Sequence, residues 1–190
     1  MKIINIKTVI LFSLFTSFLS CKAQILPLNT GLNDTPANAY KKDLSNELPS
    51  YEGVYKAAFN GKEIILYVTK IENVLQKSSR KNYYSDVLDI QYIVKSPSGT
   101  IFQDTKNNSN SQNKLYSIKT RPDINSIIFF YSGTNCRVGW GEVVLKKINS
   151  TQISWEYRPN DIILDNSKCP PSTDINIYLP ETKDLIFTKQ

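Results

Sequence analysis

The sequence predicts an all-β domain, an antiparallel barrel or sandwich of roughly nine or ten short strands. Eleven tyrosines and eight phenylalanines stand against seven glycines, and aromatic side chains pack well on pleated surfaces. Two segments, "VLDIQYIV" and "QISWEYR", alternate between apolar and polar residues as half-buried strands do. No amphipathic helix of useful length interrupts the series of hairpins. This order favours a closed meander barrel, lipocalin-like in outline, because closure removes exposed edge strands.

Residues 1–20 are typical of a secretory signal peptide. Lys2 and Lys7 precede an apolar run over 9–19, which small polar residues follow. As a helix this run would be ~16 Å long, about half the thickness of the bilayer hydrocarbon. We therefore expect the leader to be removed, and a retained membrane anchor is the less favoured alternative.

Phe18-Leu19-Ser20-Cys21 resembles a relaxed bacterial lipobox, in which Phe18 stands where leucine is usual. The resemblance implies that Cys21 becomes the first mature residue and carries acyl chains on its thiol and amine. Cleavage after Ala23 would instead release a lipid-free, secreted chain. Lys22 follows the cysteine, where an aspartate would signal retention in the inner membrane. The acidic cluster that directs some lipoproteins of such bacteria to the cell surface is also absent. We therefore expect an outer-membrane lipoprotein on the periplasmic face rather than at the cell surface.

The segment 21–49 is predicted to be a flexible tether between the lipid and a β domain over 50–190. It contains three prolines and a glycine, with few apolar residues after Leu32. Beyond it, two strands are expected on either side of the Asn60-Gly61 turn. Further strands are expected in "VLDIQYIV", "TIFQD", "LYSIKT", "INSIIFFY", "RVGWGEVVLKKI", "QISWEYR", "DINIYL" and "DLIFTK".

Cys136 and Cys169 are predicted to form a disulfide. Without Cys21 the cysteine count is even, and the exported chain would lie in an oxidising compartment. Such a bridge would stabilise the fold by ~3–4 kcal/mol in the chain-entropy model. The alternative, a reactive thiol, has only Arg137 or Lys168 nearby to lower its pKa, since the chain lacks histidine and a Cys-x-x-Cys pair.

Catalytic, metal-binding and cofactor-binding motifs are absent from the sequence. The chain contains no histidine, no calcium-loop spacing and no recognisable carboxylate pair, and neither Gly-x-Ser-x-Gly nor Ser-x-x-Lys occurs where a histidine-free hydrolase would need one. The formal net charge is +6, or +4 after removal of the two leader lysines. This modest excess fits anionic lipid headgroups or glycans better than nucleic acid, which we do not expect as a partner.

Two segments are candidate binding sites. In "QKSSRKNYYSD", Lys77, Arg80 and Lys81 stand beside Tyr83 and Tyr84, and such a loop could meet a glycan, a lipid phosphate or a protein. The alternative is a solvated loop whose tyrosines pack back onto the next strand.

The second candidate is Trp140, between Gly139 and Gly141 in "NCRVGWGE". Its ring is expected either to close one end of the barrel as part of the core or to form an aromatic platform for a ligand.

Several stretches together resemble a family of small lipoproteins from Bacteroidota, particularly flavobacteria, that carries a domain of unknown function. They are "CKAQ", "YEGVYKAAFNGKEIILYVTKIEN", "GWGEVVLKKINSTQISWEY" and "LPETKDLIFTK". The family implies localisation and β architecture but transfers no site residues. A looser similarity is to lipocalin-like barrels, with Gly53-Val54-Tyr55 where those proteins often have Gly-x-Trp.

These observations predict a non-enzymatic, membrane-tethered β domain that binds a ligand or partner in the envelope. An envelope hydrolase acting on glycans or esters, and a structural or inhibitory protein partner, are the alternatives. A deep apolar lumen would favour ligand binding inside the barrel, whereas filling by Tyr92, Trp155 and Ile177 would exclude it. Two carboxylates that converge in a cleft would favour the hydrolase.

Overall fold

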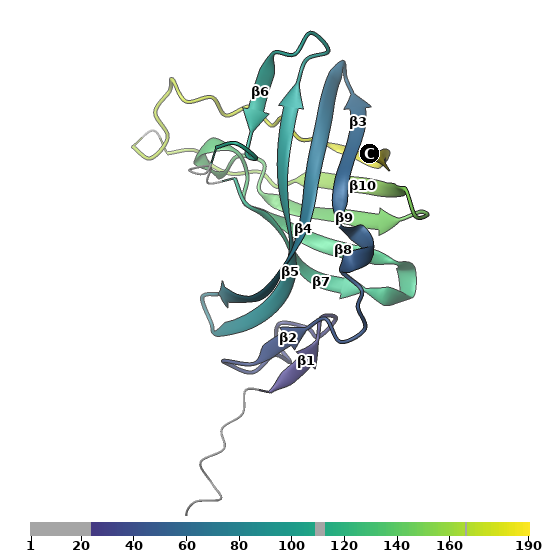
Figure 1. The fold of residues 1–190 in the computed structure, drawn as a ribbon. Coiled ribbons are helices and arrows are strands. Elements are labelled where there is room, and N and C mark those ends of the chain that lie inside the picture. Colours follow the sequence, from purple (N-terminus) through teal and green to yellow (C-terminus); the bar gives the residue numbers. More distant parts are fainter. Residues whose placement is uncertain (1–23, 109–112, 166) are drawn as a thin grey trace, which may run out of the picture.

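The computed structural model describes residues 24–108, 113–165 and 167–190, which form eleven strands and three short 3₁₀ helices (Figure 1). The strands are β1 (Ile25–Pro27), β2 (Tyr40–Lys42), β3 (Gly53–Phe59), β4 (Lys62–Lys77), β5 (Asn82–Lys95), β6 (Ile101–Asp104), β7 (Leu115–Arg121), β8 (Ser126–Tyr131), β9 (Gly141–Lys147), β10 (Gln152–Pro159) and β11 (Thr182–Lys189). The helices are η1 (Pro49–Tyr51), η2 (Pro122–Ile124) and η3 (Asn135–Arg137).

Eight of these strands close an antiparallel barrel. The order is β5-β4-β3-β11-β10-β9-β8-β7, and β7 returns to β5 through the pairing of Asp89 with Tyr116. Sequential hairpins supply all but two of the pairings, so the predicted all-β meander barrel is confirmed. Closure leaves these strands without an open edge.

The hairpin predicted at Asn60-Gly61 is confirmed between β3 and β4. Both residues have positive φ, 47° and 70°, and the flanking Phe59 and Lys62 are paired. A two-residue turn with both residues in the left-handed region matches the twist of the strands that it joins. The turn therefore sets the register of the first barrel hairpin.

The interior of the barrel is a continuous aromatic and aliphatic core. The inward positions predicted on β5 and β10 are confirmed, since Leu88, Tyr92, Trp155 and Tyr157 are completely buried. Tyr131 lies edge-on to Tyr92 and to Tyr157, with ring centroids 6.4 and 5.8 Å apart. The rings thus fill the lumen with side chains.

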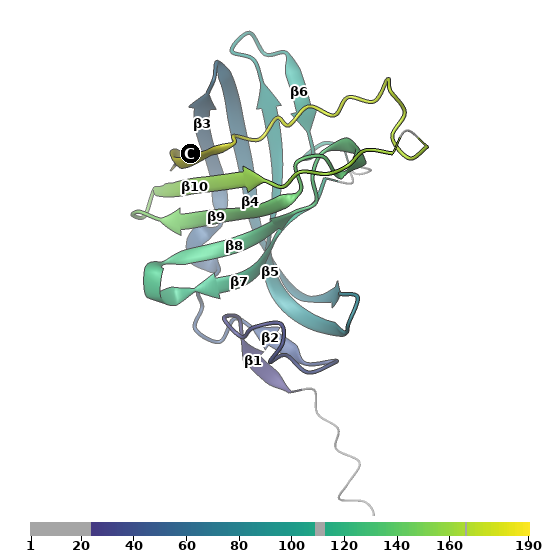
Figure 2. The ribbon, with the colours of Figure 1, turned by 180° about the vertical axis from the view of Figure 1, so that it is seen from behind.

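Alternate connections of the meander lie at opposite ends of the barrel. One end carries the β3–β4 turn and the β5–β6, β8–β9 and β10–β11 connections, and we call it the open end. The other carries the β4–β5, β7–β8 and β9–β10 turns and the entry to β3, and we call it the strap end. Figures 1 and 2 show β1 and β2 at the strap end, beside the halves of β4 and β5 that lead into the β4–β5 turn.

Residues 24–48, which we call the N-terminal strap, are packed against the strap end. The flexible tether predicted over 21–49 is therefore wrong for its described part. β2 pairs in parallel with β5 at Tyr40 and Tyr84, and β1 pairs with β2. Leu28 and Leu48 belong to the hydrophobic core. Edge pairing and burial of these isolated apolar residues hold the segment despite its prolines.

The strand predicted over "DINIYL" is also wrong. Residues 174–179 form no strand, because the Asp174 carboxylate accepts hydrogen bonds from the Asn176 backbone and from the Tyr178 hydroxyl. These local bonds engage the Asn176 N–H within its own segment instead of in a strand pairing, and Leu179 then enters the core. In Figures 1 and 2 the segment between β10 and β11 passes close to β6.

Candidate functional site

The open end of the barrel contains a cleft of about 870 Å³. Its walls come from β6, the end of β8, the β8–β9 loop and the segment before β11. The lining residues are Phe102, Gln103, Asp104, Asn108, Asn113, Phe130, Ser132, Gly133, Thr134, Asn135, Cys136, Arg137, Lys168, Asp174 and Tyr178. We call it the disulfide cleft. Its volume lies within the range of small-molecule sites.

The Cys136–Cys169 disulfide braces one wall, which confirms the predicted pairing. It connects the β8–β9 loop to the long segment between β10 and β11, across a sequence separation of 33. The Asn135 side chain adds a hydrogen bond to the Asp174 carbonyl at 2.8 Å. The two segments are therefore fixed to each other as well as to the barrel.

The β8–β9 loop needs a glycine at position 133. Its φ is +90°, and a Cβ there would lie 2.6 Å from the Arg137 backbone. Cys136 and Arg137 also have positive φ, at 57° and 63°. This tight backbone turns the loop over the cleft and places Thr134 against Gln103.

The floor of the cleft is polar and continues into the top of the core. The Tyr92 hydroxyl donates to Gln103 Oε1 at 3.0 Å and shares a hydrogen bond with the Tyr131 hydroxyl, also at 3.0 Å. Gln103 Nε2 donates to Thr134 Oγ1 at 3.1 Å. Burial raises the pKa of Tyr131 to about 12 and that of Tyr92 well above its ordinary value. Both phenols are therefore neutral at physiological pH.

An aromatic pair forms another wall. The rings of Phe102 and Tyr178 stack with centroids 5.9 Å apart and an interplanar angle of 15°. The Lys62 ammonium lies 5.4 and 5.2 Å from the two centroids, within cation–π range. Phe102 remains 39% exposed, so it can offer apolar surface to a ligand.

The charged groups of the cleft are mixed in sign. Arg137 and Lys168 are exposed cations, and Asp104 and Asp174 are carboxylates. Hydrogen bonds from the Asn176 backbone and the Tyr178 hydroxyl lower the pKa of Asp174. The Asp104 carboxylate accepts from two backbone N–H groups of its own loop, at Lys106 and Asn107.

These carboxylates suit binding better than acid catalysis. A general acid needs a raised pKa, whereas the pKa of Asp174 is lowered and its oxygens are engaged by neighbours. Within the described ranges, no three His, Cys, Asp or Glu side chains gather as metal ligands. The arrangement can present hydrogen-bond donors and acceptors, both signs of charge and one exposed ring.

The predicted cationic loop lies at the strap end, away from the cleft. Lys77 ends β4, Arg80 and Lys81 lie in the turn, and Tyr84 is on the outer face of β5 at 36% exposure. Tyr83 is buried at 9% exposure, with the Lys41 ammonium 5.9 Å from its ring centroid. Only one of the two tyrosines therefore remains available to a partner.

Trp140 is half-buried and is not among the residues that line the cleft. Its carbonyl accepts from the Asn160 backbone, which ties the start of β9 to the end of β10. A Cβ on Gly139 would lie 2.8 Å from Ile177 and from the Tyr157 hydroxyl. Close packing of the backbone explains this glycine, and the aromatic-platform alternative for Trp140 gains no support.

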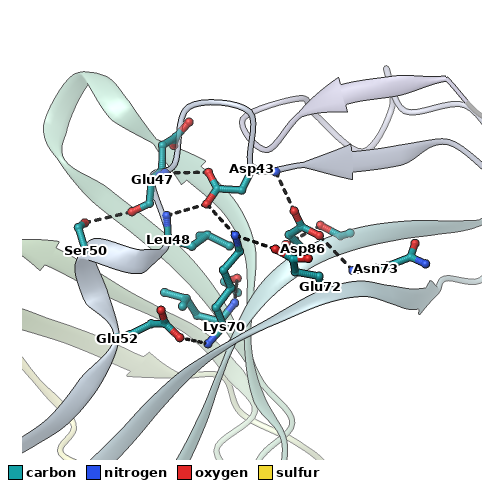
Figure 3. A network of polar contacts seen from close by, with 12 residues as sticks. Asp43, Glu47, Leu48, Ser50, Glu52, Lys70, Glu72, Asn73 and Asp86 are labelled. Atoms are coloured by element: carbon teal, nitrogen blue, oxygen red, sulfur yellow. Dashed lines mark hydrogen bonds and ion pairs between the residues drawn. The ribbon is translucent and has the colours of Figure 1, made fainter.

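A second polar cluster, shown in Figure 3, fastens the N-terminal strap to the barrel. The buried Asp86 carboxylate accepts from the Tyr40 hydroxyl at 2.5 Å, the Asp43 backbone at 2.9 Å and the Asn73 backbone at 3.0 Å. Lys70 Nζ lies 3.6 Å from the Asp43 carboxylate. Every group has a neighbour from the protein itself, so this cluster is structural.

Sequence reasoning missed the cleft residues Phe102, Gln103, Thr134, Asp174 and Tyr178. They come from three separate segments, β6, the β8–β9 loop and the segment before β11, which only the barrel closure and the disulfide bring together. The available signal was the Gly133–Gly141 loop around Cys136, which marked one wall. Cys21, the predicted lipidation site, lies outside the described residues.

Comparison of the chain with protein-family models, with curated proteins and with solved structures finds no match. Among the described residues, no helix has the length and apolar character needed to cross a bilayer.

Proposed function

We propose that this protein is a non-enzymatic binding domain of the bacterial envelope that holds a small polar ligand in the disulfide cleft. The observation that carries the proposal is the contrast between a lumen filled by aromatic side chains and a large, polar cleft at the open end. Barrel proteins that carry ligands in the lumen need a hollow interior. Here the ligand space lies between the loops instead.

The chemistry of the walls favours a hydroxyl-rich ligand such as a short glycan. Asparagine, glutamine, threonine and aspartate side chains supply both donors and acceptors. The exposed Phe102 ring can cover the apolar C–H face of a sugar. Arg137 and Lys168 would accommodate an acidic substituent. A purely apolar ligand would leave these polar groups without partners, at a cost in free energy.

Attachment to the membrane through Cys21 is the second part of the proposal. Its support is the sequence alone: the apolar leader, the lipobox-like Phe18-Leu19-Ser20-Cys21 and the resemblance to flavobacterial lipoproteins. We place the mature protein on the periplasmic face of the outer membrane. Mass spectrometry of the membrane fraction tests this: acyl chains are expected on an N-terminal Cys21, and a Cys21→Ala chain that stays membrane-bound and lipid-modified would refute it.

Calorimetric titration with soluble peptidoglycan fragments tests the cleft. Binding is expected, and Phe102→Ala should weaken it by about tenfold, the effect of losing one well-packed contact residue. The matched control is Ile163→Ala, which removes a 96% exposed side chain at the same end of the barrel but outside the cleft. Absence of binding, or equal weakening by both variants, would reject the glycan-binding cleft.

A hydrolase is the second candidate, because Asp104 and Asp174 both line the cleft. Incubation of the same fragments with the protein should release no products if the site only binds. Product release that Asp104→Asn or Asp174→Asn abolishes would establish the enzyme.

A further inference from the structure

Exposed apolar side chains collect at the strap end. Of fourteen large hydrophobic residues that are exposed in the described part of the chain, eight lie on the strap, the β4–β5 extension or the turns beside them. They are Ile25, Leu32, Leu44, Ile71, Leu75, Tyr84, Ile124 and Ile148. Single exposed apolar residues are ordinary, but a concentration on one end indicates an interaction surface.

The β4–β5 hairpin presents the most defined part of this surface. β4 and β5 have 16 and 14 residues and extend past the barrel at this end (Figure 1). Leu75 and Tyr84 are paired across the two strands and are 42% and 36% exposed. Cross-strand partners lie on the same face of a sheet, so the two side chains form one outward patch.

Three cations stand at the tip of the same hairpin. Lys77, Arg80 and Lys81 lie between Glu72 and Asp86, and no acidic residue occurs among them. Acidic residues also lie at this end: Asp34, Asp43, Glu47, Glu52, Glu72, Asp86 and Asp123. Asp86 is buried, and Asp43 and Glu72 lie 3.6 and 3.1 Å from the Lys70 ammonium, whereas the segment 73–85 contains no carboxylate. The positive charge is therefore local to the hairpin tip. Apolar side chains bordered by lysine and arginine are typical of a surface that lies on anionic lipid headgroups.

The position of β1 also indicates that the strap end faces the membrane. β1 starts at Ile25, at the strap end, only four positions after Cys21. Four residues span at most ~14 Å. An anchor on Cys21 would therefore hold this end, and not the open end, next to the bilayer.

We propose that the strap end docks on the membrane surface, with the hairpin face of Leu75, Tyr84, Lys77, Arg80 and Lys81 against anionic phospholipid headgroups. This inference rests on the proposed anchor at Cys21. It places the disulfide cleft at the far end, directed away from the bilayer into the aqueous compartment. The barrel is thus oriented by two contacts, the acyl chains and the hairpin face.

Lysine labelling of the membrane-extracted protein tests the orientation. The protein is reconstituted into vesicles of phosphatidylcholine mixed with phosphatidylglycerol, and acetylation by a water-soluble reagent is followed at each lysine by mass spectrometry. Lys77 and Lys81 should react at least about fivefold more slowly than Lys106 and Lys183 at the open end. A factor of five corresponds to the attraction of one cation to an anionic surface. In phosphatidylcholine alone the protection should shrink.

A matched pair of variants gives the control. Leu75→Ser should restore the labelling of Lys77 and Lys81, whereas Ile101→Ser, which removes a 56% exposed side chain at the open end, should not. Equal labelling at both ends, or loss of protection in both variants, overturns the docking proposal while leaving the lipid on Cys21 intact.

Failure of the anchor has a different signature. If the cells yield a lipid-free chain that begins at Gln24, the proposed anchoring is wrong, and the same vesicles are mixed with this soluble chain. Docking then predicts that the soluble chain sediments with the vesicles. The combined changes Lys77→Gln, Arg80→Gln and Lys81→Gln should weaken this binding by about a hundredfold, since each cation near the surface contributes about 1 kcal/mol. The combined changes Lys106→Gln, Arg158→Gln and Lys183→Gln remove equal charge elsewhere and should have no effect. No sedimentation, or equal loss in both sets, overturns the docking proposal as well.

Discussion

Replacement of Asp86 by asparagine should release the N-terminal strap from the barrel. Asp86 is 2% exposed, and its two carboxylate oxygens accept the Tyr40 hydroxyl, the Asp43 backbone N–H and the Asn73 backbone N–H. An asparagine has only one acceptor oxygen. Whichever way its amide is turned, an NH₂ group must face a donor, so at least one of the three bonds is lost in a buried site.

The magnitude follows from the character of these bonds. A hydrogen bond to a charged group contributes about 1.5–3 kcal/mol, and a donor left without an acceptor adds its desolvation cost. We therefore expect Asp86→Asn to lower the free energy of unfolding by about 2–4 kcal/mol. For a chain of this length that corresponds to a fall in Tm of roughly 4–16 °C. It is a large share of a typical domain stability of about 5–15 kcal/mol.

The pH dependence gives an independent check of the mechanism. Burial by itself raises the pKa of Asp86, but the hydrogen bonds from Asp43, Tyr40 and Asn73 outweigh it, and the net pKa is below the ordinary value. A carboxyl with a lowered folded-state pKa contributes stability above its unfolded pKa of about 3.9 and loses it as the pH falls through the folded value. The wild type and Asp86→Asn should therefore converge in stability below about pH 4.

Urea unfolding followed by tryptophan emission measures both effects, since Trp155 is completely buried. Asp89→Asn is the matched control, three residues along the same strand. Burial raises the pKa of Asp89, with Lys114 partly opposing this, so its carboxylate is disfavoured by folding and its removal should not destabilise. A loss below about 0.5 kcal/mol for Asp86→Asn at pH 7, or a loss that persists undiminished in acid, would refute the reasoning.

Three further predictions concern the strap, the disulfide and the β8–β9 loop. Burial and the neighbouring Lys119 lower the pKa of Lys41 to about 8. Between about pH 8 and 10.5 the unfolded chain therefore holds a proton on Lys41 that the folded chain has lost, and the free energy of unfolding should rise with pH over this range. The urea midpoint of Lys41→Met should lack the rise that the wild type shows. Thiol titration of the unfolded, unreduced protein should find neither Cys136 nor Cys169 free, and replacement of both by serine should cost ~3–4 kcal/mol in urea unfolding; two reactive thiols would contradict the bridge. Gly139→Ala would force a Cβ to within 2.8 Å of the Tyr157 hydroxyl at a φ of +72°, so a loss of roughly 1–3 kcal/mol is expected, and thermal unfolding unchanged from wild type would show that the loop can yield.

Much of the barrel could be predicted because its rules are local. Alternation along β5 and β10 identified the inward side chains, and Asn60-Gly61 specified a turn that only a tight hairpin accommodates. The disulfide was predicted from the even number of remaining cysteines and from the oxidising compartment that the leader indicates. In each case the evidence lay within a few neighbouring residues or in composition.

The N-terminal strap and the disulfide cleft could not be predicted because their partners are distant in sequence. The apolar residues of the strap follow no strand or helix period, and what holds it is edge pairing with β5, the acceptor capacity of Asp86 and burial of Leu28 and Leu48. In the segment "YYSDVLDI", Asp86 resembles an ordinary outward-facing residue of an alternating strand. The cations Lys77, Arg80 and Lys81 were identified from the sequence as a candidate binding site. Their distance from the cleft could not be predicted, because it depends on which loops lie at the same end of the barrel.

The pattern that builds the barrel also restricts where it can bind. Inward positions occupied by Tyr92, Tyr131, Trp155 and Tyr157 leave the lumen filled, so a ligand must be held by the connections between strands. At one end the strap covers the barrel, and Asp86 fastens it there. At the other end the disulfide joins the β8–β9 loop to the β10–β11 connection, and the polar cleft lies between these two segments and β6. The proposed ligand site therefore lies at the open end, and the two ends should respond separately to mutation. Asp86→Asn should loosen the strap without changing the affinity for the proposed ligand. Loss of the disulfide should weaken ligand binding without loosening the strap.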